Sequence, residues 1–445
     1  MKEKAIKIVK RLQDKGFEAV FAGGCVRDML MDIEPKDFDI ATSASPRQIK
    51  ILFPKTIAVG ENFGVIIVVD EGEHFEVATF RADHGSDGRR PIEVSFTSMR
   101  NDALRRDLTI NGIFFDPIKE ELFDFVNGEK DIKDRLIRFI GHPAERIKED
   151  NLRILRAVRF FAKSKEWNIE RKTFLSLEIF SDWLLNVSAE RIREELEKML
   201  LLPEPSVAFK MMLNLGILDV ILPELAKLDT ISQNPKWHGE GNAFVHTMLA
   251  IDTAREFSDD PIIMWGTLLH DIGKGEPDIG DDGKLIFHDH DVKGTEITNR
   301  ILRELKFSNE DRETITSIVA DHMRVKHLPN MRKSKIRRLM SEPHFDKVLL
   351  VSDIDSRSSI HEDHIDDKNK RIFVEFAENF KDELGVEPVM PELFITGHDL
   401  IKMGVSPGVR LGVIKDAIAN MQLDGDLTSR EEALEVVKEY FLRFD

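Results

Sequence analysis

A glycine pair followed by two closely spaced carboxylates stands out near the start of the sequence. Gly23-Gly24-Cys25-Val26-Arg27-Asp28 follows the apolar run 18–22, and Asp37-Phe38-Asp39 leads into a second apolar run. Side chains two apart on a strand point to the same face, so we expect Asp37 and Asp39 to lie side by side. Adjacent carboxylates repel, and Mg²⁺ shared with substrate phosphates is the usual solution. The pair therefore predicts metal-assisted phosphoryl chemistry on a nucleotide.

The glycine pair itself could supply contacts to phosphate. Gly23 and Gly24 permit a tight turn in which backbone N–H groups approach an anion, and Arg27 adds a planar donor fork. A loop glycine pair beside an exposed acidic strand is the alternative. The strand–turn–helix–strand order of residues 18–41 favours the phosphate site.

A second polar element follows at Arg105-Arg106-Asp107-Leu108-Thr109-Ile110-Asn111-Gly112. Arg106 can hold a triphosphate, while Asp107 and Asn111, one helical turn apart, can hold ribose hydroxyls. An ordinary charged helix is the alternative.

The run Glu149-Asp150-Asn151-Leu152-Arg153 is predicted to open a helix that continues to residue 162, with Asp150 and Arg153 on one face. Such a pair can read a base. Cytosine and adenine each offer an amino donor beside a ring-nitrogen acceptor, whereas guanine and uracil offer a carbonyl beside an N–H. A surface ion pair is the alternative, and Arg156 and Arg159 continue the basic face.

Histidines and acidic residues recur in the second half of the sequence. His270-Asp271 follows Leu268-Leu269 and precedes Gly273, and His238, His246, His290, His322 and Asp353-Ile354-Asp355 lie within about a hundred residues of it. Imidazoles and carboxylates from separate helices can converge on one or two metal ions that activate water. These residues predict a second, separate metal site.

Residues 23–39, with the RRDxTxN pattern at 105–111 and the EDxxR pattern at 149–153, resemble the class II tRNA nucleotidyltransferase and bacterial poly(A) polymerase superfamily. The resemblance implies Mg²⁺ at Asp37 and Asp39, with Glu76 as a third carboxylate. It implies that Asp150 and Arg153 form a protein template for C and A. It also implies that residues 84–91, including Arg89-Arg90, form a flexible loop that helps to switch between bases.

The second constellation resembles the HD phosphohydrolase superfamily. His246, His270, Asp271 and Asp355 fit its four ligand positions, with Asp353 as the fallback for the last. His290 and His322 match positions of two-metal variants. The resemblance implies a divalent transition metal such as Mn²⁺, Ni²⁺ or Fe²⁺.

Together these elements are similar to bacterial CCA-adding enzymes that carry an HD domain. The implied fold is α+β: a polymerase beta-like nucleotidyltransferase α/β head (1–143), then an all-α neck with the template (144–225), an HD-type body (226–365) and a helical tRNA-contacting C-terminal region (366–445). The implied activity is untemplated addition of C and A to the tRNA 3′ end from CTP and ATP. Gly112 departs from the Asn-Ala form common in such enzymes.

Several alternatives stay open on the sequence alone. The Gly112 departure is compatible with a specialist that adds only A or only CC. A poly(A) polymerase shares the head, although its C-terminal region is typically strongly basic and this one is acidic. An HD phosphohydrolase as the main activity, or a non-catalytic tRNA-binding protein with a degenerate head, is disfavoured by the complete set of head motifs.

Composition sets outer limits on these functions. A net charge of −17 argues against a general nucleic-acid coat, though not against a local basic groove. No apolar run approaches the length of a membrane span, and the lysine-rich first eleven residues are unlike a signal peptide. The single cysteine fits a reducing cytoplasm. The oligomeric state does not follow from the sequence.

Overall fold

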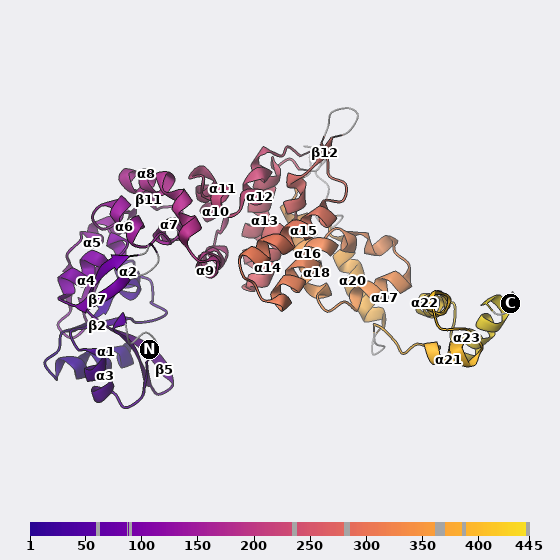
Figure 1. Cartoon of the computed structure of the whole chain (residues 1–445), viewed down its shortest axis with the longest axis horizontal. Helices are drawn as coiled ribbons and strands as arrows, with labels where there is room; N and C mark the ends of the chain where they lie inside the picture. Colours follow the sequence, from indigo (N-terminus) through magenta and orange to yellow (C-terminus); the bar gives the residue numbers. More distant parts are fainter. Residues whose placement is uncertain are drawn as a thin grey trace. The chain divides into compact units, whose positions relative to one another are not determined.

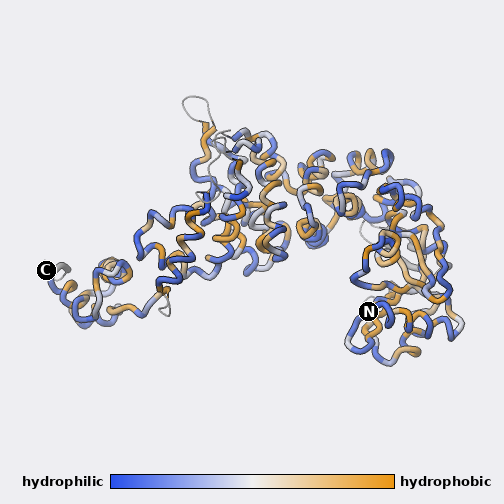
Figure 2. Tube along the Cα trace, turned by 180° about the vertical axis from the view of Figure 1, so that it is seen from behind, coloured by the Kyte–Doolittle hydropathy of each residue, from blue (hydrophilic) through white to orange (hydrophobic). Residues whose placement is uncertain are grey.

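The computed structural model describes residues 1–58, 63–86, 88, 91–233, 238–279, 285–360, 370–384 and 389–441. They belong to two compact units, Met1–Ala226 and Lys227–Asp445. The main sheet lies in the first unit, whereas the second is mostly helical (Figure 1). Hydrophobic and hydrophilic stretches alternate along the helices (Figure 2), as expected where each helix buries one side. Among the described residues no helix is long and apolar enough to cross a membrane.

A seven-stranded sheet is the framework of the first unit. Its strands are β1 (Ala19–Ala22), β2 (Ile40–Thr42), β3 (Thr56–Ile57), β4 (Val65–Asp70), β5 (Glu73–Thr79), β8 (Ile113–Asp116) and β9 (Glu121–Asp124). They lie in the order β3-β4-β5-β2-β1-β8-β9. β2 runs parallel to β5 and antiparallel to β1. Every residue of β1 and β2 is buried, which explains why both read as continuous apolar runs.

Two predictions about strands need correction. Asp37 and Asp39 precede β2 rather than lying within it. The chain is already aligned with β1 there, because the backbone N–H of Ala22 donates to the carbonyl of Asp39 at 3.0 Å. The run 59–70 also predicts a strand by its β-branched residues. It is observed as β4 from Val65, and residues 59–62 lie outside the described residues.

The segment predicted as a loop at 84–91 lies largely within a hairpin. β6 (Arg81–Ser86) and β7 (Pro91–Phe96) pair in antiparallel register, so both ends of the segment are strand. Asp87, Arg89 and Arg90 lie outside the described residues.

Short helices pack around this framework: α1 (Lys2–Gln13), α2 (Gly24–Leu30), α3 (Pro46–Leu52), α4 (Met99–Arg105) and α5 (Gly128–Lys133). α1 and α2 contact β1, and α3 contacts β4 and β5. α3 begins at a capping box in which Ser45 and Gln48 satisfy each other's backbone N–H groups, with Pro46 in the first turn.

The rest of the first unit is helical: α6 (Pro143–Glu149), α7 (Arg153–Phe161), α8 (Arg171–Ile179), α9 (Ala189–Leu200), α10 (Ser206–Asn214), α11 (Ile217–Ile221) and α12 (Pro223–Lys227). The region 144–225 was predicted to be all helical, but it contains one short strand, β11 (Asn168–Ile169). This strand pairs in parallel with β10 (Leu136–Ile137), which lies in the preceding α/β region. α7 packs against α9 and α10 through a buried face that includes Leu155 and Val158.

The second unit contains α13 (Ala243–Phe257), α14 (Pro261–Leu269), α15 (His290–Glu304), α16 (Asn309–Asp321), α17 (Lys333–Met340), α18 (Phe345–Ser358), α20 (Ile372–Leu384), α21 (Gly397–Lys402), α22 (Val409–Asp424) and α23 (Arg430–Val436). A short hairpin joins β12 (Asp278–Ile279) to β13 (Leu285–Ile286). α14 and α18 contact each other, and each of them also contacts α13 and α16. The fully buried Trp265 packs edge-on against Phe307 beside them. A separate small core around Leu400 and Ile418 joins α21, α22 and α23.

Candidate active site and metal centre

Three carboxylates gather where β2 and β5 begin to run side by side. Ile40 pairs with Val77, so Asp39 stands beside Glu76 one residue earlier in the register. Burial first, and then the negative charges of Glu76 and Asp37, raise the pKa of Asp39 to about 7. Carboxylates that oppose each other's ionisation fit a divalent cation, and oxygen ligands suit Mg²⁺.

These three carboxylates are spaced more widely than the tightest ligand clusters of the protein. Among the described residues, groups of three His, Asp or Glu side chains with ligand atoms all within 4.8 Å occur in the second unit.

The turn at Gly23 tolerates no side chain. Its φ is +70°, and a Cβ there would lie 2.9 Å from Nη1 of Arg106. Arg106 is itself held, because Nη1 donates to the carbonyl of Asn111 at 3.1 Å and two further N–H groups donate to Asp102. The glycine turn and the RRDxTxN element therefore contact each other directly.

A buried hydrogen-bond network runs from the RRDxTxN element to the glycine turn on one side and to α7 on the other. Arg156 donates to Asp107 at 2.7 Å, and Asn111 donates to the other oxygen of Asp107 at 3.2 Å. Arg27 donates to Asn111 at 2.7 Å and also to Asp28. Burial alone would raise the pKa of Asp107, but Arg156 and then Arg153 hold it well below its usual range. The nucleotide-binding candidates thus form one connected unit.

The Gly112 departure has a local packing cause. A Cβ on Gly112 would lie 2.8 Å from Cγ2 of Val126 and 3.0 Å from Cδ1 of Ile140. A side chain at this position would therefore require Val126 and Ile140 to shift.

Four cations surround one aromatic ring beside this network. Arg27, Arg156, Arg159 and Lys163 lie 4.9, 5.8, 4.6 and 5.3 Å from the centroid of the Phe160 ring. Loss of solvent around the ammonium group and then repulsion by Arg27 lower the pKa of Lys163 to about 8. Lys163 was not among the sequence candidates. Its spacing from Arg156 and Arg159, one turn apart along a basic face, is the signal that could have found it.

The base-reading pair is arranged differently from the prediction. Residues 149–153 do not open one helix: α6 ends at Glu149 and α7 begins at Arg153, so Asp150 lies at the junction. Arg153 donates to Glu149 and to the carbonyl of Arg105 at 2.9 Å. Asp150 is held by Arg191 of α9, whose two terminal nitrogens donate at 2.8 and 3.2 Å. Each member therefore has its own positioning partner.

The helix α9 was given no chemical role by sequence reasoning, yet it holds the template from one side. Besides Arg191, it contributes Glu195, which accepts from Nε of Arg159 at 2.7 Å. On another side, the carbonyl of Gly88 in the β6–β7 connection accepts from the backbone N–H of Asn151 at 3.0 Å. The segment predicted to help switch bases thus contacts the template junction.

In the second unit, His246, His270, Asp271 and Asp355 converge from α13, from the end of α14 and from α18. Nε2 of His246 lies 3.0 Å from an oxygen of Asp355, and Nε2 of His270 lies 3.3 Å from an oxygen of Asp271. All four side chains are buried. Carboxylates held together with imidazoles in this way form a candidate metal-ligand set.

A second group shares one of these ligands. The other oxygen of Asp271 lies 3.5 Å from Nε2 of His290 and 3.8 Å from Nε2 of His322. Close packing brings α15 to this place, because a Cβ on Gly273 would lie 2.0 Å from the carbonyl oxygen of His290. Asp271 therefore stands between two ligand groups, as a carboxylate that bridges two ions would.

The orientation of three histidine rings is fixed by the backbone. Nδ1 of His270, His290 and His322 lies 2.7, 2.9 and 2.7 Å from the carbonyl oxygen three residues earlier in each case. A carbonyl only accepts, so each Nδ1 carries the proton and each Nε2 is the nitrogen free to bind a metal. All three Nε2 atoms are buried with no hydrogen-bond partner among the described residues. Burial lowers the pKa of His322 to about 3, which leaves its ring neutral.

Two other sequence candidates lie outside this ligand set. Asp353, the fallback ligand, is bound by Arg357 and Arg371. His238 belongs to a separate close group with Glu240 and His246: its Nδ1 contacts Glu240 at 2.8 Å, and the same oxygen of Glu240 contacts Nδ1 of His246 at 2.8 Å. Glu240 was missed by sequence reasoning, although its position two residues after a histidine was visible.

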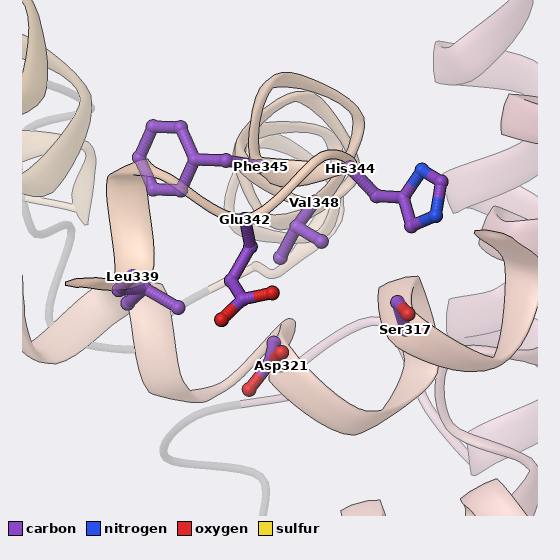
Figure 3. A pocket seen from close by; sticks show the side chains of 7 residues that line it. All are labelled: Ser317, Asp321, Leu339, Glu342, His344, Phe345 and Val348. Atoms are coloured by element: carbon purple, nitrogen blue, oxygen red, sulfur yellow. The ribbon is translucent and has the colours of Figure 1, made fainter. Parts of the chain in front are cut away.

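A pocket in the second unit is separate from both sites. It is lined by Ser317, Asp321, Leu339, Glu342, His344, Phe345 and Val348 (Figure 3). The carboxylates of Asp321 and Glu342 face the same space, and no lysine or arginine is among the lining residues. This arrangement does not suit a nucleotide phosphate.

Comparison with known protein families accounts for most of the chain. Residues 19–138 match the family model for the Poly A polymerase head domain, residues 167–228 match the probable RNA and SrmB-binding site of polymerase A, and residues 243–360 match the HD domain. The CCA-adding enzyme of Ligilactobacillus salivarius is 31% identical over 440 residues, which is 97% of this chain and 95% of that enzyme. The chain belongs to the CCA-adding enzyme family.

Shorter alignments in this family are closer in sequence. The CCA-adding enzyme of Lactobacillus helveticus is 42% identical over 213 residues, 47% of this chain and about half (53%) of that enzyme. The crystal structure of the Bacillus stearothermophilus CCA-adding enzyme in complex with CTP superposes with a TM-score of 0.71, at 23% identity, over 99% of this chain and 98% of that one. The Thermotoga maritima CCA-adding enzyme complexed with tRNA gives a TM-score of 0.60 at 19% identity. These likenesses confirm the predicted α+β fold with a nucleotidyltransferase head and an HD domain.

Proposed function

We propose that this protein is a tRNA nucleotidyltransferase that adds C and A to the tRNA 3′ end from CTP and ATP, without a nucleic-acid template, releasing pyrophosphate. The observation that carries the proposal is the network from Arg27 through Asn111 and Asp107 to Arg156. It joins the glycine turn, the RRDxTxN element and the base-reading helix in one unit. Membership of the CCA-adding enzyme family, with relatives solved in complex with CTP and with tRNA, supports it.

In this proposal Asp37, Asp39 and Glu76 hold Mg²⁺, since burial and the charges of Glu76 and Asp37 oppose the ionisation of Asp39 in the absence of a cation. Bound there, Mg²⁺ supplies activation of the attacking 3′-hydroxyl and neutralises charge on the triphosphate. The N–H of Gly23 is donated to the carbonyl of Ile113, so the turn at Gly23 serves to present the backbone N–H of Gly24. That N–H and the cations around Phe160, including Lys163, bind the triphosphate. Asp107 and Asn111 position the ribose, and Arg106 fixes the turn.

Base selection falls to Asp150 and Arg153. A carboxylate has about four lone-pair sites, so Asp150 can accept from an exocyclic amine while Arg191 holds it. Arg153 uses its terminal nitrogens on Glu149 and backbone carbonyls and keeps Nε for a ring nitrogen. C and A satisfy both groups, whereas U and G leave both unsatisfied.

Three primers test the proposal: tRNA ending at the discriminator base, at C, and at CC, each with CTP, ATP or both. A CCA-adding enzyme extends the first two with CTP up to CC, and extends the third with ATP by one residue. An enzyme that adds only A, or only CC, fails on one class of primer. Extension of every primer by many A residues would instead identify a poly(A) polymerase.

We propose that the second unit holds a separate divalent-metal hydrolase centre. Three buried Nε2 atoms without hydrogen-bond partners among the described residues support this proposal. His246, His270, Asp271 and Asp355 would bind one ion, and Asp271, His290 and His322 a second; nitrogen-rich ligand sets suit Mn²⁺, Ni²⁺ or Fe²⁺. A bound metal ion supplies activation of water for attack on a phosphate ester. For the cell compartment we propose the cytoplasm, since the one cysteine, Cys25, is a buried thiol.

The two centres should be separable by mutation. His270→Ala combined with Asp271→Ala should remove metal-dependent phosphatase and phosphodiesterase activity, and leave nucleotide addition within about twofold of wild type. Parallel assays of both reactions on the same preparation check this. Loss of nucleotide addition in a folded double variant would contradict two independent sites.

Glu240 should control metal affinity without being a ligand in the two groups above. It holds Nδ1 of His246, which turns Nε2 toward Asp355, so Glu240→Ala should weaken Mn²⁺ binding about 10- to 100-fold. Isothermal titration of the metal-free protein with Mn²⁺ measures this. Glu276→Ala serves as the control, because Glu276 is an exposed carboxylate shortly after Asp271 in the sequence and is not part of the histidine cluster. Equal affinity in both variants would contradict the positioning role.

A further inference from the structure

One segment of the second unit is strongly basic within an acidic surrounding. Lys227–Asp445 carries 29 Lys and Arg against 42 Asp and Glu, a net charge of −13. Residues 324–338 (RVKHLPNMRKSKIRR) nevertheless hold seven Lys or Arg and no acidic residue. Such local concentration of one sign creates a potential that the net charge hides.

Four of the seven cations have partners within the protein. Arg324 pairs with Asp321, Lys326 with Asp355, and Arg337 and Arg338 donate to Val389 and Asn420. The segment is anchored by these contacts and by the buried Ile336 and Leu339 of α17. The other three cations of the segment, Arg332, Lys333 and Lys335, are therefore attached to a backbone that is held in place.

Arg332, Lys333 and Lys335 are exposed, and within the described part of the chain they form no ion pair. They also lie at the N-terminal end of α17, where positive charge is unfavourable for the helix. Arg332 is the N-cap, Lys333 and Lys335 are in the first turn, and no acidic residue lies there. Cations at a helix N-terminus oppose its dipole. Three charges that stabilise neither an ion pair nor the helix indicate a role outside the folding of the chain.

We propose that Arg332, Lys333 and Lys335 form a surface that binds the phosphate backbone of the RNA substrate. The inference rests on the proposed function, which brings tRNA to this protein. A regular array of phosphates is the ligand that unpaired Lys and Arg on a rigid helix fit. α17 also packs on α22, which further fixes the position of the three cations.

The test is the salt dependence of tRNA binding in the full-length triple variant Arg332→Gln, Lys333→Gln, Lys335→Gln. Each phosphate that is no longer neutralised reduces the slope of log K against log salt by about 0.9, so the slope should fall by about 2 to 3. At about 0.1 M salt the Kd for tRNA should rise about 10- to 100-fold. KM for tRNA should rise correspondingly while kcat for nucleotide addition at saturating tRNA stays unchanged. The thermal midpoint should not fall, because the removed charges oppose the helix dipole.

The matched control removes three exposed cations elsewhere in the same unit: Lys227→Gln, Arg303→Gln and Lys306→Gln. Equal Kd and salt slope in the two triple variants would overturn the proposal. The proposal would also be overturned if the triple variant at 332–335 kept wild-type tRNA binding but lost binding to anionic phosphatidylglycerol vesicles, because the surface would then bind a membrane rather than RNA. Failure of the wild-type protein to extend any tRNA primer would instead refute the proposed function, so the two failures are distinguishable.

Discussion

Asp39→Ala should abolish nucleotide addition and leave the protein as stable as wild type or more so. The carboxylate of Asp39 is opposed by those of Glu76 and Asp37, so its removal relieves repulsion in the metal-free protein. With a metal ligand gone, kcat for CTP addition should fall at least about 10³-fold, the scale on which loss of one electrostatic stabiliser acts. Single-turnover addition to tRNA ending at the discriminator, together with thermal unfolding, measures both effects.

The matched control for this experiment is Glu34→Ala. Glu34 is an exposed carboxylate in the same connection between α2 and β2, and it is not among the predicted ligands. The control variant should keep kcat within about twofold of wild type. If Asp39→Ala added nucleotides at nearly the wild-type rate, Asp39 would not be a metal ligand. If its unfolding midpoint fell strongly, the carboxylate would have a structural role instead.

Asp150→Ala should lose selectivity as well as rate, with UTP and GTP gaining relative to CTP and ATP. In the proposed base-reading role, a wrong base sets a carbonyl against the Asp150 carboxylate and an N–H against the Arg153 guanidinium, and each mismatch costs about 1–3 kcal/mol. That range corresponds to discrimination of about tenfold to several hundredfold. Single-turnover addition of each nucleotide, on primers ending at the discriminator and at CC, gives the ratios.

The positions of the partners sharpen this prediction. Arg191→Gln removes the two hydrogen bonds that hold Asp150, so it should also reduce the ratio of CTP to UTP addition, but less than Asp150→Ala does. Glu194→Gln on the same helix is exposed and should leave the ratio unchanged. An unchanged ratio in Asp150→Ala would mean that its contact with Arg191 is purely structural and that base selection lies elsewhere.

The elements that the sequence predicts well are those with a strong local pattern. The buried strands β1 and β2 and the turn at Gly23 follow from apolar runs and from a backbone conformation that glycine adopts easily. The histidine cluster was also visible, because His270 and Asp271 are adjacent and precede a helix-breaking glycine, Gly273.

What the sequence did not predict depends on contacts between distant segments. Local spacing pairs Asp150 with Arg153, its neighbour along the chain, whereas its observed partner is Arg191, 41 residues away. The predicted helix over 149–153 is broken at that place, since Asp150 and Asn151 make contacts outside the helix pattern with Arg191 and Gly88. Glu240 is similar, because its link to His246 depends on the turn before α13.

The most direct test of the central claim is the sequence of the tail that the purified protein makes on tRNA lacking its 3′ end, with all four nucleoside triphosphates present together. Sequencing of the 3′ ends at a series of times reports both the order of addition and where it stops. The structure predicts two C residues, then one A, then no further growth, with U and G rare at each position. Tails of many A residues, or tails in which U and G appear as often as C and A, would contradict it.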